Sequence, residues 1–346
     1  MGNNLFRPGG PLRISRVGGN RFNASISIPK DRDGRIAREC PNDSCSPGYF
    51  KIRLGTGITG KQYETFCPYC RHRADSQKFA TQEQQRYAKD LVMREARRGV
   101  DRMIRDSFNL GPFGRRTLVD GFIKMEVNLK SAPLPHVSPP FEDQVRRDVV
   151  CPSCGLDQTV FGLATWCADC GKDIFLMHVA AELTVVRSML NDVDRRRELL
   201  GQRVASKDLE NCLEDAVSIF EAALKALTRR NLSQSGRTTE QVETQLKKVG
   251  MTFQDILRTC DALRELVGIA EVPGVQWDAL NAAFQKRHPI THNLGVMDRK
   301  YLERVQSRER EGREIRITAP EIATTLDNVQ AAVTAIHAQL FPSLPA

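Results

Sequence analysis

The chain has 346 residues, of which 40% are hydrophobic and 27% are charged, and its formal net charge is +9 with a pI near 9.1. This length predicts two or three domains with enough apolar side chains for a core. The positive charge favours a polyanionic partner such as RNA or DNA. No apolar run approaches the roughly 18 residues of a membrane span, and the start, MGNNLFRPGG, lacks the apolar centre of a signal peptide. We therefore expect a cytoplasmic protein with no membrane partner.

The chain contains 10 cysteines, and eight of them fall into short pairs. In a cytoplasmic protein such pairs indicate metal binding rather than disulfides. The first two pairs are Cys40 with Cys45 and Cys67 with Cys70. Two pairs carried on hairpins bring four thiolates to a tetrahedral point, as a structural zinc ion requires. A redox Cys-x-x-Cys site is the alternative, but it would not need the second pair. We expect a first zinc ribbon over about residues 39–72.

A basic helix is predicted after this ribbon. Thr81-Gln82-Glu83-Gln84 has the pattern of a capping box that opens a helix. Apolar residues at helical spacing, including Val100 and Phe108, are expected to pack inward. The other face is rich in arginine, which favours contact with a phosphate backbone. Interleaved acidic residues leave a solvated face as an equally open interpretation. The candidate nucleic-acid-binding residues are Arg94, Arg97, Arg98 and Arg102.

A proline-rich stretch divides the chain. Residues 118–129 predict a strand, and 131–142 then contain Pro133, Pro135, Pro139 and Pro140. This proline density excludes regular structure and predicts a semi-rigid spacer. We therefore place an N-terminal domain, with the first ribbon and the basic helix, at 1–130 and a linker at 131–142.

The second ribbon, predicted at 143–174, has the more regular spacing. Its pairs are Cys151 with Cys154 and Cys167 with Cys170, and each pair is followed by a glycine. Glycine tolerates the positive φ that turns backbone amides toward the sulfurs. A module this short cannot bury enough apolar surface, so an ion that binds with about 10–16 kcal/mol must stabilise it. Because both ligand sets are closed, we expect two structural zinc ions and no catalytic metal.

From Phe175 the apolar period changes from two to 3.6, which predicts helices through 175–346. Five or six amphipathic helices joined by short loops form an antiparallel bundle. The fold class is therefore α+β, mainly α, with two small β zinc ribbons followed by a helical bundle. Two long helices are predicted first: one over 176–200 and one that is capped by Ser206 and ends at a polar loop over 231–237. Three further helices follow: one over 238–250, one that Thr252 opens, and one that carries Trp277 to Arg287. A last helix is predicted from Thr318 or Pro320 to Leu340.

The stretch RHPITHN, which begins at Arg287, carries the candidate catalytic chemistry. A ribose 2'-OH attacks its own 3'-phosphate when a base takes its proton, and imidazole titrates near neutral pH. A forked guanidinium stabilises the extra charge of the pentavalent phosphate. His292 is thus the candidate base and Arg287 the phosphate clamp, with His288 as a second acid/base or a donor to phosphate. Asn293 and Asp298 are expected to orient the histidine.

This stretch resembles the R-x(4–6)-H signature of HEPN domains, which are helical bundles found in many prokaryotic toxins and defence ribonucleases. The longer pattern RHPITHN-x-G-x-x-D-x-x-Y, which ends at Tyr301, is also similar to bacterial members. The resemblance covers about the last half of the chain. It implies a homodimer whose two motifs form one composite site, metal-independent endoribonuclease activity on RNA, and a toxin or antiviral role with a protein trigger or antitoxin. Pro289 departs from the pattern and is expected to bias His288 away from helical geometry.

A second class of function remains open at this point. In a non-catalytic adaptor, the ribbons and the basic helix would bind nucleic acid or protein and the bundle would only dimerise. The RHPITHN stretch would then be a capping cluster at a helix end. A redox or zinc-dependent enzyme is disfavoured, because the sequence has no HExxH motif and its paired cysteines form closed sets.

Overall fold

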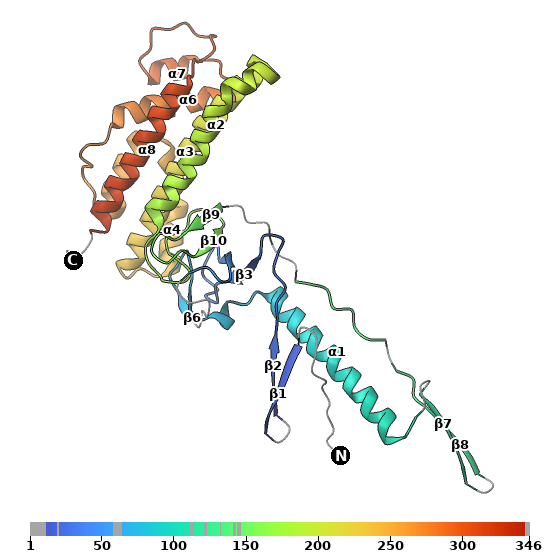
Figure 1. Cartoon of the computed structure of the whole chain (residues 1–346). Helices are drawn as coiled ribbons and strands as arrows, with labels where there is room; N and C mark the ends of the chain where they lie inside the picture. Colours follow the sequence, from blue (N-terminus) through green and yellow to red (C-terminus); the bar gives the residue numbers. More distant parts are fainter. Residues whose placement is uncertain are drawn as a thin grey trace.

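The computed structural model describes residues 12–18, 21–57, 64–110, 114–120, 123–131, 133–140, 143 and 147–342. Small antiparallel sheets precede a helical C-terminal part, which confirms the predicted fold class. Figure 1 shows the sheets of the two ribbons at one end of the helical bundle, with α1 extending away from them. Among the helices of the described ranges, none is both long and apolar enough to cross a membrane.

The two ribbons share one four-stranded sheet. Its order is β3-β4-β10-β9, with bounds β3 (Arg35–Glu39), β4 (Tyr49–Arg53), β9 (Arg147–Val150) and β10 (Asp157–Val160). Strand β4 of the first ribbon pairs antiparallel with β10 of the second, with Ile52 opposite Gln158 and Phe50 opposite Val160. The spacer at 131–142 therefore separates the ribbons in the sequence, while the sheet joins them in space.

A single core lies beneath this sheet. Phe50 and Val160 are fully buried on its two central strands, and they belong to one cluster with Phe79 and Leu156. Loops from the two ribbons also interlock, because the Thr165 and Trp166 amides donate to the Pro68 carbonyl at 2.8 and 3.0 Å. We conclude that the ribbons fold as one unit.

Three hairpins accompany the sheet: β1 (Leu12–Gly18) with β2 (Arg21–Ile26), β5 (Glu64–Phe66) with β6 (Arg73–Asp75), and β7 (Arg115–Asp120) with β8 (Ile123–Asn128). A 3-10 helix, η1 (Ser76–Phe79), follows β6. The prediction of one strand over 118–129 is wrong. Asp120 lies opposite Ile123, so β7 and β8 are two antiparallel strands rather than one. Gly121, a residue type that is disfavoured in strand interiors, stands between them in the sequence.

Helix α1 (Gln82–Ser107) begins with the predicted capping box. Thr81 Oγ1 accepts from the Gln84 amide at 3.2 Å, and Gln84 Oε1 accepts from the Thr81 amide at 3.3 Å. The expected inward packing is wrong for the distal part of the helix, where Val100 is 47% and Phe108 53% exposed. Because α1 projects away from the ribbons (Figure 1), its distal apolar stripe has little surface to cover it.

The bundle consists of α2 (Phe175–Leu200), α3 (Gln202–Gln234), α4 (Thr239–Val249), η2 (Thr252–Gln254), α5 (Ile256–Val267), α6 (Trp277–Asn293), α7 (Arg299–Arg304) and α8 (Ala319–Leu340). Helices α2, α3 and α8 pack along one another (Figure 1). Their apolar stripes form one core that includes Leu183, Phe220, Phe284 and Val329. The predicted bounds of α2, α4 and α8 are confirmed, and Thr318 caps α8.

Three predicted boundaries are wrong. Helix α3 begins at Gln202 rather than after Ser206, because Gly201 with φ of 91° makes the whole turn between α2 and α3. It then continues to Gln234, through most of the predicted loop at 231–237. Asp255, and not Thr252, caps the longer helix α5, where its carboxylate accepts from the Arg258 amide at 3.2 Å.

Helix α6 continues through Pro289 to Asn293, so the expectation that Pro289 moves His288 out of helical geometry is wrong. Pro289 is buried, and its carbonyl accepts from the amides of Leu294 and Gly295 in the C-cap. The helix ends there because Leu294 has a left-handed φ of 51°. The proline thus lies in the last turns of the helix, where its carbonyl anchors the cap.

Asp173 ties the second ribbon to the bundle. Its Oδ1 accepts from the Phe175 amide at 2.9 Å, and its Oδ2 pairs with Arg230 on α3 and with His337 on α8. Burial by itself would raise the pKa of Asp173, but the bonds from His337, Phe175 and Arg230 outweigh burial and lower it to about 2. The guanidinium carbon of Arg230 also lies 4.3 Å from the Trp166 ring centroid.

We predict that Asp173→Asn lowers the free energy of unfolding at pH 7 by about 2 kcal/mol, because Arg230 loses a charged acceptor. The lowered folded-state pKa means that this contribution is complete above the unfolded value of about 4 and is lost as pH falls toward 2. Urea titrations of both proteins measure the difference at each pH. Asp194→Asn is the control, because that carboxylate is 84% exposed and pairs only within α2. Equal stability of wild type and Asp173→Asn at pH 7 would contradict the prediction.

Candidate functional site

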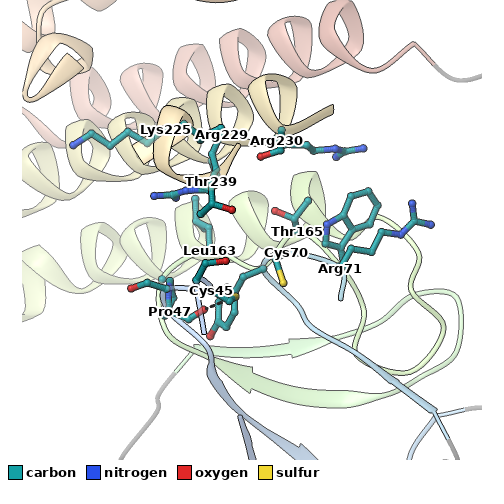
Figure 2. A pocket seen from close by; sticks show the side chains of 18 of the residues that line it. Cys45, Pro47, Cys70, Arg71, Leu163, Thr165, Lys225, Arg229, Arg230 and Thr239 are labelled. Carbon is teal, nitrogen blue, oxygen red and sulfur yellow. Dashed lines mark hydrogen bonds between the residues drawn. The ribbon is translucent and has the colours of Figure 1, made fainter. Parts of the chain in front are cut away.

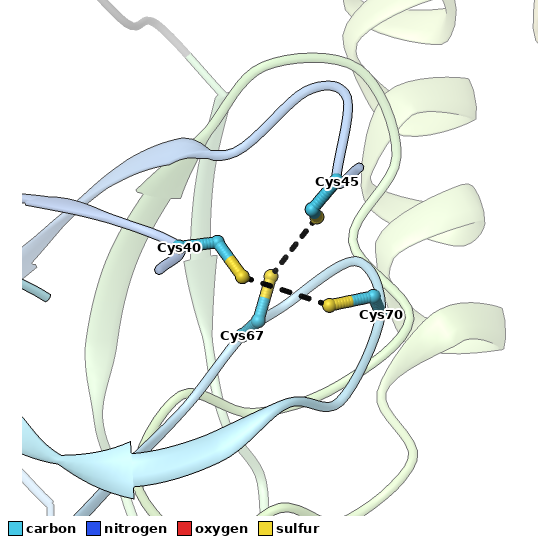
Figure 3. A group of neighbouring side chains, drawn as sticks. All are labelled: Cys40, Cys45, Cys67 and Cys70. Atoms are coloured by element: carbon cyan, nitrogen blue, oxygen red, sulfur yellow. Dashed lines mark hydrogen bonds between the residues drawn. The ribbon is translucent and has the colours of Figure 1, made fainter. Parts of the chain in front are cut away.

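The first cysteine group has the geometry of a tetrahedral metal site. Figure 3 shows the four thiols converging from two loops. The Sγ atoms of Cys40 and Cys70 lie 3.7 Å apart and those of Cys45 and Cys67 3.6 Å apart. A tetrahedron with zinc–sulfur bonds of about 2.3 Å has sulfur–sulfur edges of about 3.8 Å. A disulfide would need a separation of about 2.05 Å. The four thiols therefore fit a zinc ion.

The second cysteine group has the same dimensions. Its Sγ separations are 3.7 Å for Cys151 with Cys170 and 3.5 Å for Cys154 with Cys167. The four ligand atoms of each group lie within 4.8 Å of one another. Each set supplies four thiols and leaves no position for a substrate, as in structural rather than catalytic zinc sites.

A left-handed residue follows three of the cysteine pairs. Gly155 and Gly171 have φ of 76° and 64°, as their position after each pair predicted. Their amides donate to the carbonyls of Cys151 and Cys167 and close the turn. Arg71 occupies the same position after Cys70, with φ of 62° and a bond of 3.0 Å from its amide to the Cys67 carbonyl. The first ribbon thus uses this turn without glycine.

His288 and His292 form a pair near the end of α6. They lie one helical turn apart, with ring centroids separated by 5.0 Å. The His292 side chain is exposed and that of His288 is half-buried. Between them, Thr291 Oγ1 donates to Glu214 on α3 at 2.8 Å and fixes this end of the helix. Burial, together with the neighbouring charge of His292, lowers the pKa of His288 below its ordinary value. His288 therefore holds its second proton less tightly than an isolated imidazole does.

Arg287 points away from this pair. Its Nη1 donates to Gln254 Oε1 on η2 at 2.7 Å. Five positions along a helix separate Arg287 from His292, which places them about 140° apart around the axis. Within the described ranges no hydrogen bond joins Arg287 to either imidazole. One chain thus brings the two histidines together and turns the arginine toward η2.

The two supporting residues serve the backbone. Asn293 Nδ2 donates to the Val296 carbonyl at 2.7 Å, and Asp298 Oδ1 accepts from the Tyr301 amide at 2.7 Å as the N-cap of α7. They shape the turn after α6. Over the described part of the chain, neither side chain is hydrogen-bonded to an imidazole.

The four candidate nucleic-acid-binding arginines on α1 lie far from the histidine pair, because α1 and α6 are at opposite ends of the molecule (Figure 1). Arg97 and Arg98 are exposed, whereas Arg94 and Arg102 are partly buried. Arg98 pairs with Glu95 at 2.7 Å on the same helix. Any contact of these arginines with nucleic acid would be separate from the histidine pair.

Sequence reasoning missed a cavity of about 570 Å³ between the ribbon loops and the helices α3 and α4. Figure 2 shows Lys225, Arg229 and Arg230 on the α3 side and Cys45 and Pro47 on the ribbon side. Three segments that are distant in the sequence form its walls. Its one sequence signal was the adjacent pair of arginines, 229 and 230, next to an apolar helical stripe.

We predict two zinc ions per chain, one in each cysteine group. Cys154→Ser should reduce the zinc content to one ion per chain or fewer. The second group loses one of its four thiolates, and the first group can lose its ion as well because both metal sites share one sheet. Elemental analysis of the purified chain measures the ratio. Cys260→Ser is the control, because Cys260 lies on α5 outside both groups. Two ions retained by Cys154→Ser would contradict the assignment.

We also predict that His292→Gln raises the pKa of His288, because the substitution removes a neighbouring positive charge while burial remains. Titration of the imidazole signals by NMR measures the shift directly. His136→Gln is the control, since His136 lies in the spacer and contacts Ser138. An unchanged or lower pKa of His288 in His292→Gln would show that the two rings do not interact in solution.

No family model, curated protein or solved structure matches this chain. The functional assignment therefore rests on the geometry of its own residues. Those residues form two four-thiol metal sites, a solvent-accessible histidine pair and a basic cavity.

Proposed function

We propose that the protein is a metal-independent endoribonuclease of the HEPN type that acts as a homodimer. The observation that carries the proposal is the pair of His288 and His292 one turn apart at the exposed end of α6, with ring centroids 5.0 Å apart. Two imidazoles at this spacing supply both a base and an acid near neutral pH. The net charge of +9 supports a polyanionic substrate.

In the proposed reaction, neutral His292 takes the proton from a ribose 2'-OH. The 2'-oxygen then forms a bond to the adjacent phosphorus while the bond from phosphorus to the 5'-oxygen breaks. His288 in its protonated form gives a proton to the leaving 5'-oxygen. Its lowered pKa makes the protonated form the stronger acid. The products are a 2',3'-cyclic phosphate and a 5'-hydroxyl, and no oxidant or metal takes part.

The proposed site combines two copies of the chain. Arg287 lies on a different side of α6 from His292 and bonds to Gln254, so it does not border a phosphate held by its own histidines. We propose that the α6 ends of two copies meet and that Arg287 of each copy leaves Gln254 to stabilise the phosphate held by the other copy's histidines. A guanidinium suits the spread charge of a pentavalent phosphate.

The remaining parts receive roles that follow from their position. The two zinc ions would be structural, and the ribbon unit with α1 would recruit RNA, a protein trigger or an antitoxin. A cytoplasmic toxin or antiviral effector is the biological role that the resemblance to HEPN domains implies. Exposed Arg97 and Arg98 are the arginines on α1 best placed to contact a phosphate backbone.

A non-catalytic adaptor is the second candidate, and one observation favours it. The bond of 2.7 Å from Arg287 to Gln254 gives the arginine a structural partner in each single chain. The bundle would then serve dimerisation, and the ribbon unit would carry the binding surface.

We predict that the wild-type protein cleaves labelled RNA in excess EDTA and leaves cyclic-phosphate ends. His292→Ala should slow cleavage by at least about 100-fold, because the base is lost. Gel electrophoresis measures the rate of cleavage, and mass spectrometry identifies the cyclic-phosphate ends. His136→Ala, which removes a histidine from the spacer, is the control and should retain the wild-type rate. Two results would favour the adaptor. One is RNA cleavage that persists in His292→Ala, and the other is no cleavage by the wild-type protein with any of the RNA substrates and nucleotide additives tested.

A further inference from the structure

The cavity between the ribbon unit and the bundle has the size and chemistry of a small-molecule site. Its volume of about 570 Å³ lies within the range of roughly 300–1,000 Å³ that is typical of such sites. Lys225, Arg229 and Arg230 of α3 form one wall, and loops of both ribbons form the other (Figure 2). Arg71 projects from the first ribbon at its edge. The cavity lies apart from the histidine pair, since neither imidazole lines it.

Basic side chains outnumber acidic ones on the lining of the cavity. Among the described residues that line it, Arg71, Lys225, Arg229 and Arg230 are basic and Glu243 is the one acid. Glu243 pairs with Arg229 at 2.9 Å. Arg71 is exposed, and no carboxylate in the described part of the chain pairs with it. Arg230 pairs with Asp173 and Lys225 pairs with Glu221, and the Nε of Arg230 is buried without an acceptor among the same residues. An anion in the cavity can therefore bind Arg71 directly and compete with carboxylates for the other cations.

The first turn of α4 adds to this preference. Thr239, the first residue of this 11-residue helix, lines the cavity (Figure 2). The amides of a first helical turn carry partial positive charge and bind phosphate oxygens readily. Together with Arg229 and Lys225 they provide donors for more than one phosphate group.

An aromatic wall lies beside the charges. The guanidinium carbon of Arg71 lies 4.3 Å from the Trp166 ring centroid. Because Arg71 is exposed while Trp166 is buried beneath it, a planar base can stack on the outer face of the guanidinium. A ligand that uses both this stacking surface and the other cations has a planar base and several phosphates.

A chain of hydrogen bonds connects this cavity with Arg287. Lys225 Nζ donates to Glu221 Oε1 at 2.5 Å, and Gln254 Nε2 donates to Glu221 Oε2 at 2.5 Å. Gln254 in turn accepts from Arg287 through its Oε1 at 2.7 Å. A phosphate that draws Lys225 away from Glu221 removes a cation from that carboxylate, which then accepts more strongly from Gln254. Through Gln254 it strengthens the hold on Arg287.

We propose that this cavity binds a nucleoside polyphosphate and that its occupancy is coupled to Arg287 through Glu221 and Gln254. The coupling, as regulation of RNA cleavage, rests on the function proposed above, whereas the binding does not. Because Arg287 adds positive charge near Glu221, removing it strengthens the hold of Glu221 on Lys225 and weakens ligand binding. Linkage requires the same coupling in both directions.

Isothermal titration of the full-length zinc-loaded protein with ATP tests the binding. The double variant Lys225→Gln/Arg229→Gln should raise the Kd at least about tenfold. Arg195→Gln/Arg203→Gln removes the same charge from exposed sites on α2 and α3 outside the cavity and should bind as wild type. Arg71→Gln tests the opposite wall of the cavity. It should also raise the Kd for ATP, because the base loses the guanidinium on which it stacks. Zinc content and circular dichroism confirm that each variant is folded.

Three results would overturn the binding site: no ATP binding at millimolar concentration, equal affinity in the cavity and control variants, or inorganic tripolyphosphate binding as tightly as ATP. Equally tight binding of tripolyphosphate would show that the cavity recognises the phosphates and not the nucleoside.

The coupling has its own measurement. Arg287→Ala should raise the Kd for ATP by about fivefold, and the adjacent Lys286→Ala should leave it unchanged. An unchanged Kd in Arg287→Ala would overturn the coupling. Because this measurement needs no RNA, its outcome is distinguishable from a failure of the ribonuclease proposal.

Discussion

The pairing of β4 with β10 is the constraint on which the architecture depends. Each ribbon alone is a pair of short hairpins around four thiols, too small to bury a core of its own. The antiparallel register of Phe50 with Val160 joins them and closes the core that contains Phe79 and Leu156. The metal sites then act on one sheet, so the ribbon unit presents a rigid face to the bundle.

That face meets the bundle through apolar packing, with Leu163 against the bundle core and Met177 against the ribbon core, and through polar contacts. Asp173 holds Arg230 and His337, and Arg230 also covers Trp166. These contacts leave the basic cavity at the junction, on the side where α3 and α4 meet. Among the described residues, hydrogen bonds through Glu221 and Gln254 connect the proposed site at the end of α6 with the cavity. The proposed coupling between the ribbon unit and the ribonuclease site would therefore pass through α3.

Local signals predicted most of the elements. The cysteine spacing predicted both four-thiol groups, the capping box predicted the start of α1, and Thr238 and Thr318 predicted the starts of α4 and α8. Where the prediction was wrong, longer-range packing decided. Helix α3 continued past its polar end, and α6 continued through Pro289 to a last turn in which Thr291 Oγ1 donates to Glu214 on α3.

The candidate site was predictable only in part. The spacing of His288 and His292 by four residues, once the helix continues, places the rings on one face. The direction of Arg287 depends on Gln254, and the pairing of β4 with β10 depends on strands more than 100 positions apart. No local pattern records either contact, and the cavity between three distant segments was missed for the same reason.

The central claim is that the arginine of one copy acts with the histidines of the other, and a mixing experiment tests it most directly. Arg287→Ala and His292→Ala chains, each inactive alone, are unfolded, mixed and refolded with zinc so that copies exchange, and RNA cleavage in EDTA is then measured. The account predicts that the mixture recovers partial activity, because a mixed dimer holds one intact site. A mixture that forms mixed dimers and remains inactive would contradict it.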